Sequence, residues 1–205
     1  YFWSMKLNQA RNQATAFSSR GNPLARMQWI VSDDAEKNVS TTIPEAHSDI
    51  LFLQYTSGST SNPKGVMVTH ETLIENCAAV VDHQPVGVSW LPQYHDMGLI
   101  ASWLTAVYFA VPFVVMSPLL FLTSPKRWLW AIHQHRGTLS GAPNFAYALC
   151  LRQIKDEDLV GLDLSCWRGA FNGAEPVSPS TLSRFGKRFS AFGFRVEAIV
   201  PVYGL

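Results

Sequence analysis

Short apolar, β-branched runs alternate with helix-length segments along most of the chain, and this alternation limits the possible folds more than any other feature. It predicts a largely parallel sheet covered by helices on both faces, which is the α/β class. In such sheets, ligands bind at the loops beyond the strand ends. Strands are expected at 50–55, 65–68, 86–91, 112–116, 138–141, 167–172 and 195–202, and helices at 70–81, 99–110, 124–136, 144–154 and 178–189.

Capping residues indicate where several of these helices begin. Thr69 is the expected N-cap of the helix at 70–81, with Thr72 followed by Glu75 as a weaker alternative start. Two later helices are each expected to begin with a Ser-Pro pair, at 124–125 and 178–179, because proline suits the first helical position.

The 29 residues from Met97 to Pro125 carry no charge and are long enough to span a bilayer. However, Pro112 and Pro118 divide them into a helix-length piece at 99–110 and a short β-branched piece at 112–116. A buried helix followed by a buried strand is therefore expected, with no membrane span.

The chain has 205 residues, of which 16 are basic and 15 acidic. Such a balance, without runs of like charge, does not favour nucleic acid or an anionic membrane surface as a partner. Cys77, Cys150 and Cys166 lie far apart and form no metal-like cluster, which favours a reducing compartment and a cytoplasmic location.

The stretch "QYTSGSTSNPKGVMVTH", residues 54–70, looks like a phosphate-binding loop but departs from the Walker A pattern. Pro63 precedes Lys64, Gly65 follows it, and the next residues favour a strand over a helix. Gly58 nevertheless permits a tight turn, and Lys64 supplies a positive charge. Hydroxyls that can donate to phosphate oxygens belong to Thr56, Ser57, Ser59, Thr60 and Ser61. On composition alone, a plain hairpin loop fits about as well.

The order of the residues "YTSGSTSNPKGV" resembles the signature loop of the adenylate-forming superfamily, which includes acyl-CoA synthetases and fatty-acyl-AMP ligases. "SWLPQYHDMGLI" (89–100) resembles the next core motif, in a form similar to the fatty-acyl-AMP ligase branch. "SGAPNFAYALC" (140–150), "LDLSCWRGAFNGAEPV" (162–177) and the final "YGL" are also similar to that branch. The resemblance covers residues 49–205, whereas residues 1–48 match loosely and are expected to be an irregular lead-in.

The resemblance implies part of the large N-terminal domain of the adenylate-forming fold, truncated at both ends, without the small C-terminal domain and its lysine. It also implies conversion of a fatty acid and ATP, with Mg²⁺, into fatty-acyl-AMP and pyrophosphate, followed by transfer to an acyl carrier protein. A fatty-acyl-CoA synthetase is the first alternative, and a non-catalytic homologue that binds acyl chains or adenylate is the second.

The resemblance further implies residue roles. Lys64 and His95 are the expected catalytic residues. Nucleotide contacts are expected from Thr56, Ser57, Gly58, Ser59, Thr60, Lys64, Asn172, Gly173, Ala174, Glu175, Pro176, Tyr203 and Gly204. The acyl pocket is expected from His95, Asp96, Met97, Ser140, Gly141 and Ala142, and Thr56 is the candidate for Mg²⁺ through the phosphates.

Simpler interpretations of these residues remain open. Asp96 can cap the helix that begins at Met97, with or without His95 lining a site. The segments 172–176 and 140–142 can each be an ordinary turn. A metal phosphohydrolase needs more ligands than this His-Asp pair, and no G-x-S-x-G motif supports a serine hydrolase.

Overall fold

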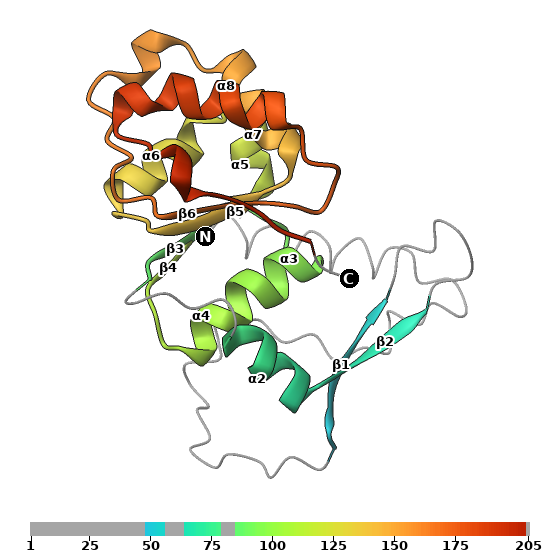
Figure 1. The fold of residues 1–205 in the computed structure, drawn as a ribbon. Helices are drawn as coiled ribbons and strands as arrows, with labels where there is room; N and C mark the ends of the chain where they lie inside the picture. Colours follow the sequence, from blue (N-terminus) through green and yellow to red (C-terminus); the bar gives the residue numbers. More distant parts are fainter. Residues whose placement is uncertain (1–47, 56–63, 79–84, 204–205) are drawn as a thin grey trace, which may run out of the picture. The chain divides into compact units, whose positions relative to one another are not determined.

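The computed structural model describes residues 48–55, 64–78 and 85–203, and its main element is a five-stranded sheet (Figure 1). The strand order is β4-β3-β5-β6-β7, and every neighbouring pair is parallel. The predicted α/β class is therefore confirmed. The strands are β3 (Gly87–Ser89), β4 (Phe113–Val115), β5 (Leu139–Ala142), β6 (Gly169–Asn172) and β7 (Ile199–Pro201).

Helices cover both faces of this sheet (Figure 1). One face packs against the core helices, and its core includes Val88, Ala142 and Ala170 from the strands. These helices are α5 (Pro118–Thr123), α6 (Lys126–Gln134), α7 (Asn144–Gln153) and α8 (Pro179–Phe189). The other face meets α3 (Asp96–Gly98), η3 (Leu99–Leu104) and α4 (Thr105–Tyr108).

Aromatic rings fill the core between the sheet and the core helices. Trp128 is fully buried and lies edge-to-face against Phe121, Tyr147 and Trp167, an arrangement that aromatic pairs favour. Its Nε1 donates to Ser140 Oγ (2.8 Å), and that hydroxyl donates to the carbonyl oxygen of Val88. The Trp128 indole N–H and the Ser140 hydroxyl thereby gain partners, which avoids a desolvation cost of about 1–3 kcal/mol each.

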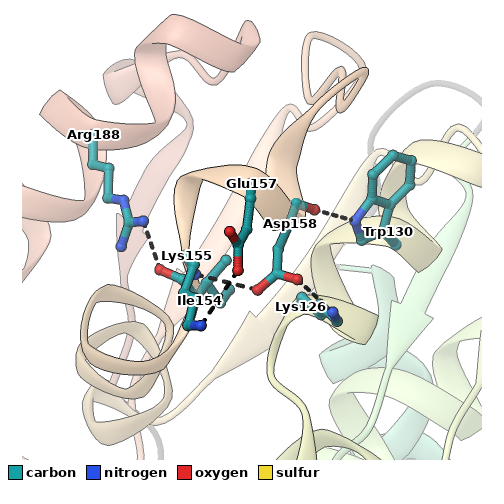
Figure 2. A network of polar contacts seen from close by, with 7 residues as sticks. All are labelled: Lys126, Trp130, Ile154, Lys155, Glu157, Asp158 and Arg188. Carbon is teal, nitrogen blue, oxygen red and sulfur yellow. Dashed lines mark hydrogen bonds and ion pairs between the residues drawn. The ribbon is translucent and has the colours of Figure 1, made fainter.

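The short helix η4 (Asp156–Leu159) is tied to α6 and α8 by polar contacts (Figure 2). Asp158 accepts from Lys126 Nζ (2.5 Å), and its carbonyl oxygen accepts from Trp130 Nε1 (2.9 Å). On the other side, Arg188 donates to Ile154 O and to Asp156 Oδ1. The hydrogen bond from Lys126 holds the pKa of Asp158 below its usual value.

The helical segment after Asp96 differs from the single helix expected at 99–110. Residues 99–104 form a π-helix, in which the Thr105 amide donates to Ile100 O, and the Thr105 hydroxyl donates to the same oxygen (2.8 Å). The helix ends earlier than expected because Ala110 adopts a left-handed conformation (φ 50). Ala110 N donates to Val107 O and Val111 N to Ala106 O, which is a Schellman motif.

The strands β1 (Ile50–Tyr55) and β2 (Gly65–Thr69) form a separate antiparallel hairpin, followed by α2 (His70–Ala78). Thr69 Oγ1 accepts from Thr72 N (3.0 Å), so the prediction of Thr69 as N-cap is confirmed and the later start at Thr72 is wrong. The described part of this helix ends at Ala78, and residues 79–81 of the prediction lie outside the described residues.

The Ser-Pro starts have mixed outcomes. Ser178 caps α8 as predicted, accepting from Thr181 N with Pro179 as the first helical residue. At α6 the prediction is wrong, because Pro125 is the N-cap and no side chain caps the helix. The helix α5 was not predicted, although Ser117 caps it in the same way and Pro118 follows as its first residue.

The expected final strand at 195–202 is too long, because η6 (Val196–Ala198) precedes β7, and η5 (Ser190–Phe192) follows α8. The stretch at 86–91 forms a strand only over Gly87–Ser89, and that at 167–172 only over Gly169–Asn172. Among the described residues, no helix combines the length and apolar character that a membrane span requires.

Candidate active site at the carboxyl edge of the sheet

The loops that follow three of the parallel strands, β3, β6 and β7, carry several of the predicted site residues. His95 and Asp96 come after β3, and residues 173–176 after β6. Tyr203 comes after β7. Because parallel strands end at the same edge, these segments meet at one edge of the sheet, here called the carboxyl edge. Open parallel sheets bind ligands at this position.

His95 and Asp96 form a close pair in the loop after β3. His95 Nδ1 lies 2.6 Å from Asp96 Oδ1, and Asp96 Oδ1 accepts from Met97 N at 2.7 Å. Met97 N also points to Nδ1 as an acceptor over a longer 3.3 Å, a bond that requires Nδ1 to carry no proton. The shorter contacts favour a proton on Nδ1 that is donated to Asp96, which leaves Nε2 for a substrate. Both side chains are about half exposed, at 54% and 43%.

His95, and not Asp96, occupies the N-cap position of α3. The expected cap at Asp96 is therefore shifted by one residue, although Asp96 also accepts from the Met97 amide. Gly98 fixes the turn, because a Cβ there would overlap the carbonyl oxygen of Pro92. The motif "HDMG" thus has a local structural role as well as a candidate chemical one.

Asn172 to Pro176 lie beside the end of β7. Val202 N donates to Asn172 O (2.8 Å), and a Cβ on Gly173 would lie 2.6 Å from Val202 O. Glycine is therefore required for this close approach. Tyr203 follows directly and is 88% exposed. The structure brings the predicted nucleotide residues of β6 and β7 together.

Asn172 and Glu175 both contact the start of α7, Asn172 from a buried position and Glu175 from an exposed one. Asn172 is fully buried, its Nδ2 donates to Asn144 Oδ1 (3.4 Å), and its Oδ1 has no hydrogen-bond partner. Glu175 was expected at the nucleotide, but its carboxylate accepts from Phe145 N (2.6 Å) at the start of α7. Ala174 between them adopts a left-handed conformation (φ 66).

A pocket lies on the sheet face opposite the core helices, beneath η3 and α4. It has a volume of about 60 Å³, and its walls are mostly apolar. Its lining residues are Pro85, Gly87, Val88, Ala101, Ser102, Thr105, Ala106, Phe109, Val111, Phe113, Leu139, Ser140, Gly141 and Phe171.

The three small residues predicted for the acyl pocket lie on different faces of β5, because successive strand residues point to opposite faces. Gly141 faces the pocket, where a Cβ would lie 3.3 Å from Met97 Cε. Ser140 contributes to the lining, but its hydroxyl is bonded in the core. Ala142 is fully buried in the core cluster and does not line the pocket.

The aromatic lining residues Phe109, Phe113 and Phe171 were not predicted from the sequence. Phenylalanine is typical of any core, so composition gives no signal for them. The register that pairs Phe113 with Gly87 and Phe171 with Gly141 would have indicated these two, since it sets which side chains share a face. Phe109 follows the helix α4, so no strand register indicates it.

Two buried titratable groups pack behind the carboxyl edge. Burial raises the pKa of the Tyr147 hydroxyl, which donates to Phe171 O (2.8 Å). Burial also raises the pKa of the Cys150 thiol. Both groups therefore stay neutral, and their role is structural.

Lys64 is exposed and directly precedes β2. The hydroxyl loop before it, with Thr56, Ser57, Gly58, Ser59 and Thr60, lies outside the described residues, as does Gly204. Among the residues that are described, no group of three His, Cys, Asp or Glu side chains is placed to hold a metal ion.

Comparison with known proteins gives consistent matches. The sequence model of the AMP-binding enzymes matches residues 6–205. The medium-chain-fatty-acid acyl-carrier-protein ligase JamA of Moorena producens is 43% identical over 98% of this chain. The ligase TtuA of Teredinibacter turnerae, of the same description, is 48% identical over 77% of the chain. The chain spans only 35% of the length of JamA and 25% of TtuA.

The crystal structure of a fatty acyl-adenylate ligase of L. pneumophila, in complex with acyl adenylate and pyrophosphate, matches with a TM-score of 0.73 and 49% identity. The match covers 76% of this chain and 28% of that one. A second structure, of a fatty acid AMP ligase from Legionella pneumophila, matches with a TM-score of 0.74 and 46% identity over 84% of this chain and 31% of that one.

Proposed function

Because this chain belongs to the AMP-binding enzyme family, we propose that the full-length protein activates a fatty acid with ATP and passes the acyl group to an acyl carrier protein. The observation that carries the proposal is the meeting of His95, residues 172–176 and Tyr203 at the carboxyl edge, next to an apolar pocket. JamA and TtuA are both medium-chain-fatty-acid acyl-carrier-protein ligases, which supports the same substrate class and acceptor for this protein.

The reaction needs positioned charge and no protein nucleophile. A carboxylate oxygen of the fatty acid attacks the α-phosphorus of ATP, and the bond from that phosphorus to the bridging oxygen breaks. Pyrophosphate leaves with the electron pair, and acyl-AMP remains. His95 Nε2, oriented through the Nδ1 contact with Asp96, would stabilise charge on the reacting carboxylate and phosphate. Lys64 and the hydroxyl loop 56–60 would hold the leaving pyrophosphate.

The pocket beneath η3 is proposed to take the aliphatic chain. Met97, which follows the His95–Asp96 pair, lies at Gly141 on its wall. From Gly141 to Leu139 the lining follows the strand for about 7 Å toward its amino end, where Phe109 and Phe113 also line it. A chain whose carboxylate lies at His95 would enter between Met97 and the sheet.

The nucleotide fits the loop after β6. Asn172 Oδ1 is a buried acceptor that lacks a donor, and an adenine amino group has the complementary chemistry. Tyr203 offers an exposed ring on which a base can stack. Mg²⁺ would be held through the phosphates with Thr56, which lies outside the described residues. A cytoplasmic location completes the proposal and fits the free cysteines Cys77, Cys150 and Cys166.

The test is exchange of labelled pyrophosphate into ATP by the full-length protein, with a series of saturated fatty acids. We expect exchange only when a fatty acid is present, because reversal requires acyl-AMP. The proposal is contradicted if no exchange occurs, or if the exchange rate is the same with and without fatty acid. Either result favours a non-catalytic homologue. Adding either coenzyme A or a carrier protein bearing phosphopantetheine then identifies the acceptor, and acylation of coenzyme A alone favours the synthetase.

A further inference from the structure

The helix α7 begins without a local cap. Its N-cap residue is Pro143, which forms no side-chain capping bond, yet the first amide groups of a helix need acceptors. Glu175 supplies one from 30 positions further along the chain, with Oε1 2.6 Å from Phe145 N. Its negative charge also suits the positive end of the helix dipole.

Asn144, the first residue of α7, contacts the same loop in two further places. Its Oδ1 accepts from Ser178 N (3.1 Å) and from Asn172 Nδ2 (3.4 Å). The segment 172–178 is therefore held at both ends and in its middle by the first turn of one helix. On its other side, Asn172 O accepts from Val202 N.

The bonds from the segment 172–178 to α7 on one side and to Val202 on the other hold a strained backbone conformation in place. Ala174 adopts a left-handed backbone conformation (φ 66), which is unfavourable for a residue with a Cβ and persists only where the surroundings enforce it. Glu175 is the next residue, so its bond to Phe145 N acts directly on this strained position.

We propose that Glu175 and Asn144 are positioning residues that fix the loop 172–176 in its nucleotide-binding conformation by tying it to the start of α7. The inference rests on the proposed function, since it takes this loop as the adenine site. In this arrangement the Glu175 carboxylate binds the start of α7, and the loop backbone and Asn172 contact the base.

The experiment compares Glu175→Ala, Glu175→Gln and Asn144→Ala in the full-length protein. We expect Glu175→Ala to raise the KM for ATP about 3- to 10-fold, which corresponds to the loss of one helix-capping bond. The KM for the fatty acid should stay within about twofold, because the pocket beneath η3 is untouched. Glu175→Gln keeps an acceptor oxygen and should lie between wild type and Ala, while Asn144→Ala should show the same ATP-specific effect.

Asp158→Ala is the matched control, because it also removes a carboxylate and lowers stability. Asp158 follows the carboxyl end of α7, whereas Glu175 binds its amino end. The helix has ten residues and is therefore about 15 Å long. We expect it to lower Tm while leaving both KM values unchanged.

The inference is overturned if Glu175→Ala leaves the KM for ATP unchanged, raises both KM values equally, or behaves like Asp158→Ala. Wild-type protein without fatty-acid-dependent exchange instead contradicts the proposed function. In that case, calorimetric binding of AMP alone to wild type and Glu175→Ala decides the inference: equal affinities, or no AMP binding by wild type, overturn it, and weaker binding by the variant supports it.

Discussion

The direction of one hydrogen bond decides what His95 can do. With the proton on Nδ1 shared with Asp96 Oδ1, Nε2 is the nitrogen that a ligand meets. Asp96 has a second task, since the same oxygen accepts from Met97 N. Removing the Asp96 carboxylate would therefore affect the orientation of the ring and the start of α3 together.

We predict that His95→Ala lowers kcat of fatty-acid-dependent pyrophosphate exchange about 100-fold. Removing one hydrogen-bond donor that stabilises transition-state charge has an effect of this size in other enzymes. Because the side chain is 54% exposed, Tm should change by less than about 2 °C. Asp96→Asn keeps an acceptor for Met97 N and should cost less, about 10-fold. A His95→Ala variant with more than half of the wild-type kcat would rule out the assigned role.

Phe113 is predicted to limit the length of the acyl chain. Its ring occupies the space next to Gly87 within the pocket lining. Phe113→Ala should shift kcat/KM toward longer fatty acids, by about fourfold for each additional methylene that becomes buried. Phe192→Ala, a partly buried phenylalanine outside the pocket, is the control and should leave the chain-length profile unchanged. An identical profile for Phe113→Ala would exclude Phe113 as the limit.

At the scale of elements, the sequence predicts regular segments well and irregular ones poorly. The strand at 50–55 and the helix beginning at Asn144 have the predicted starts because their apolar patterns are local. The π-helix was not predictable, since the i−5 contact of Thr105 with Ile100 competes with α-helical bonding without changing the pattern. The structural role of Glu175 was also hidden, because Phe145 becomes its neighbour only once β5 and β6 pair.

The attachment of η4 predicts a pH-dependent stability. The pKa of Asp158 is lowered mainly by its hydrogen bond from Lys126, so the ionised form is favoured in the folded state. Its stabilising effect is complete above the unfolded value of about 4 and is lost as the pH falls through the lower folded value. Urea unfolding should therefore show wild type more stable than Asp158→Asn at pH 7, with the difference shrinking below about pH 4. A difference that is constant from pH 7 to pH 3 would contradict this origin.

For the whole molecule, the alternation of apolar runs predicts the parallel sheet, and the sheet predicts where a site can lie. The site prediction from the sequence includes His95, Asn172 and Tyr203, and these residues lie at or after the carboxyl ends of β3, β6 and β7. What it does not reveal is the orientation of individual side chains. Ala142 points into the core and Gly141 into the pocket, although they are neighbours in one predicted motif.

The strand order β4-β3-β5-β6-β7 also has a kinetic consequence. The loops of the carboxyl edge come from strands that are far apart in the chain, from β3 at Gly87 to β7 at Ile199. Such non-local pairing forms slowly, because loop-closure entropy is lost before the contacts are gained. The proposed nucleotide site can therefore form only after β7 has joined the sheet, and recovery of nucleotide binding should follow the slowest step of refolding, later than the recovery of helical signal.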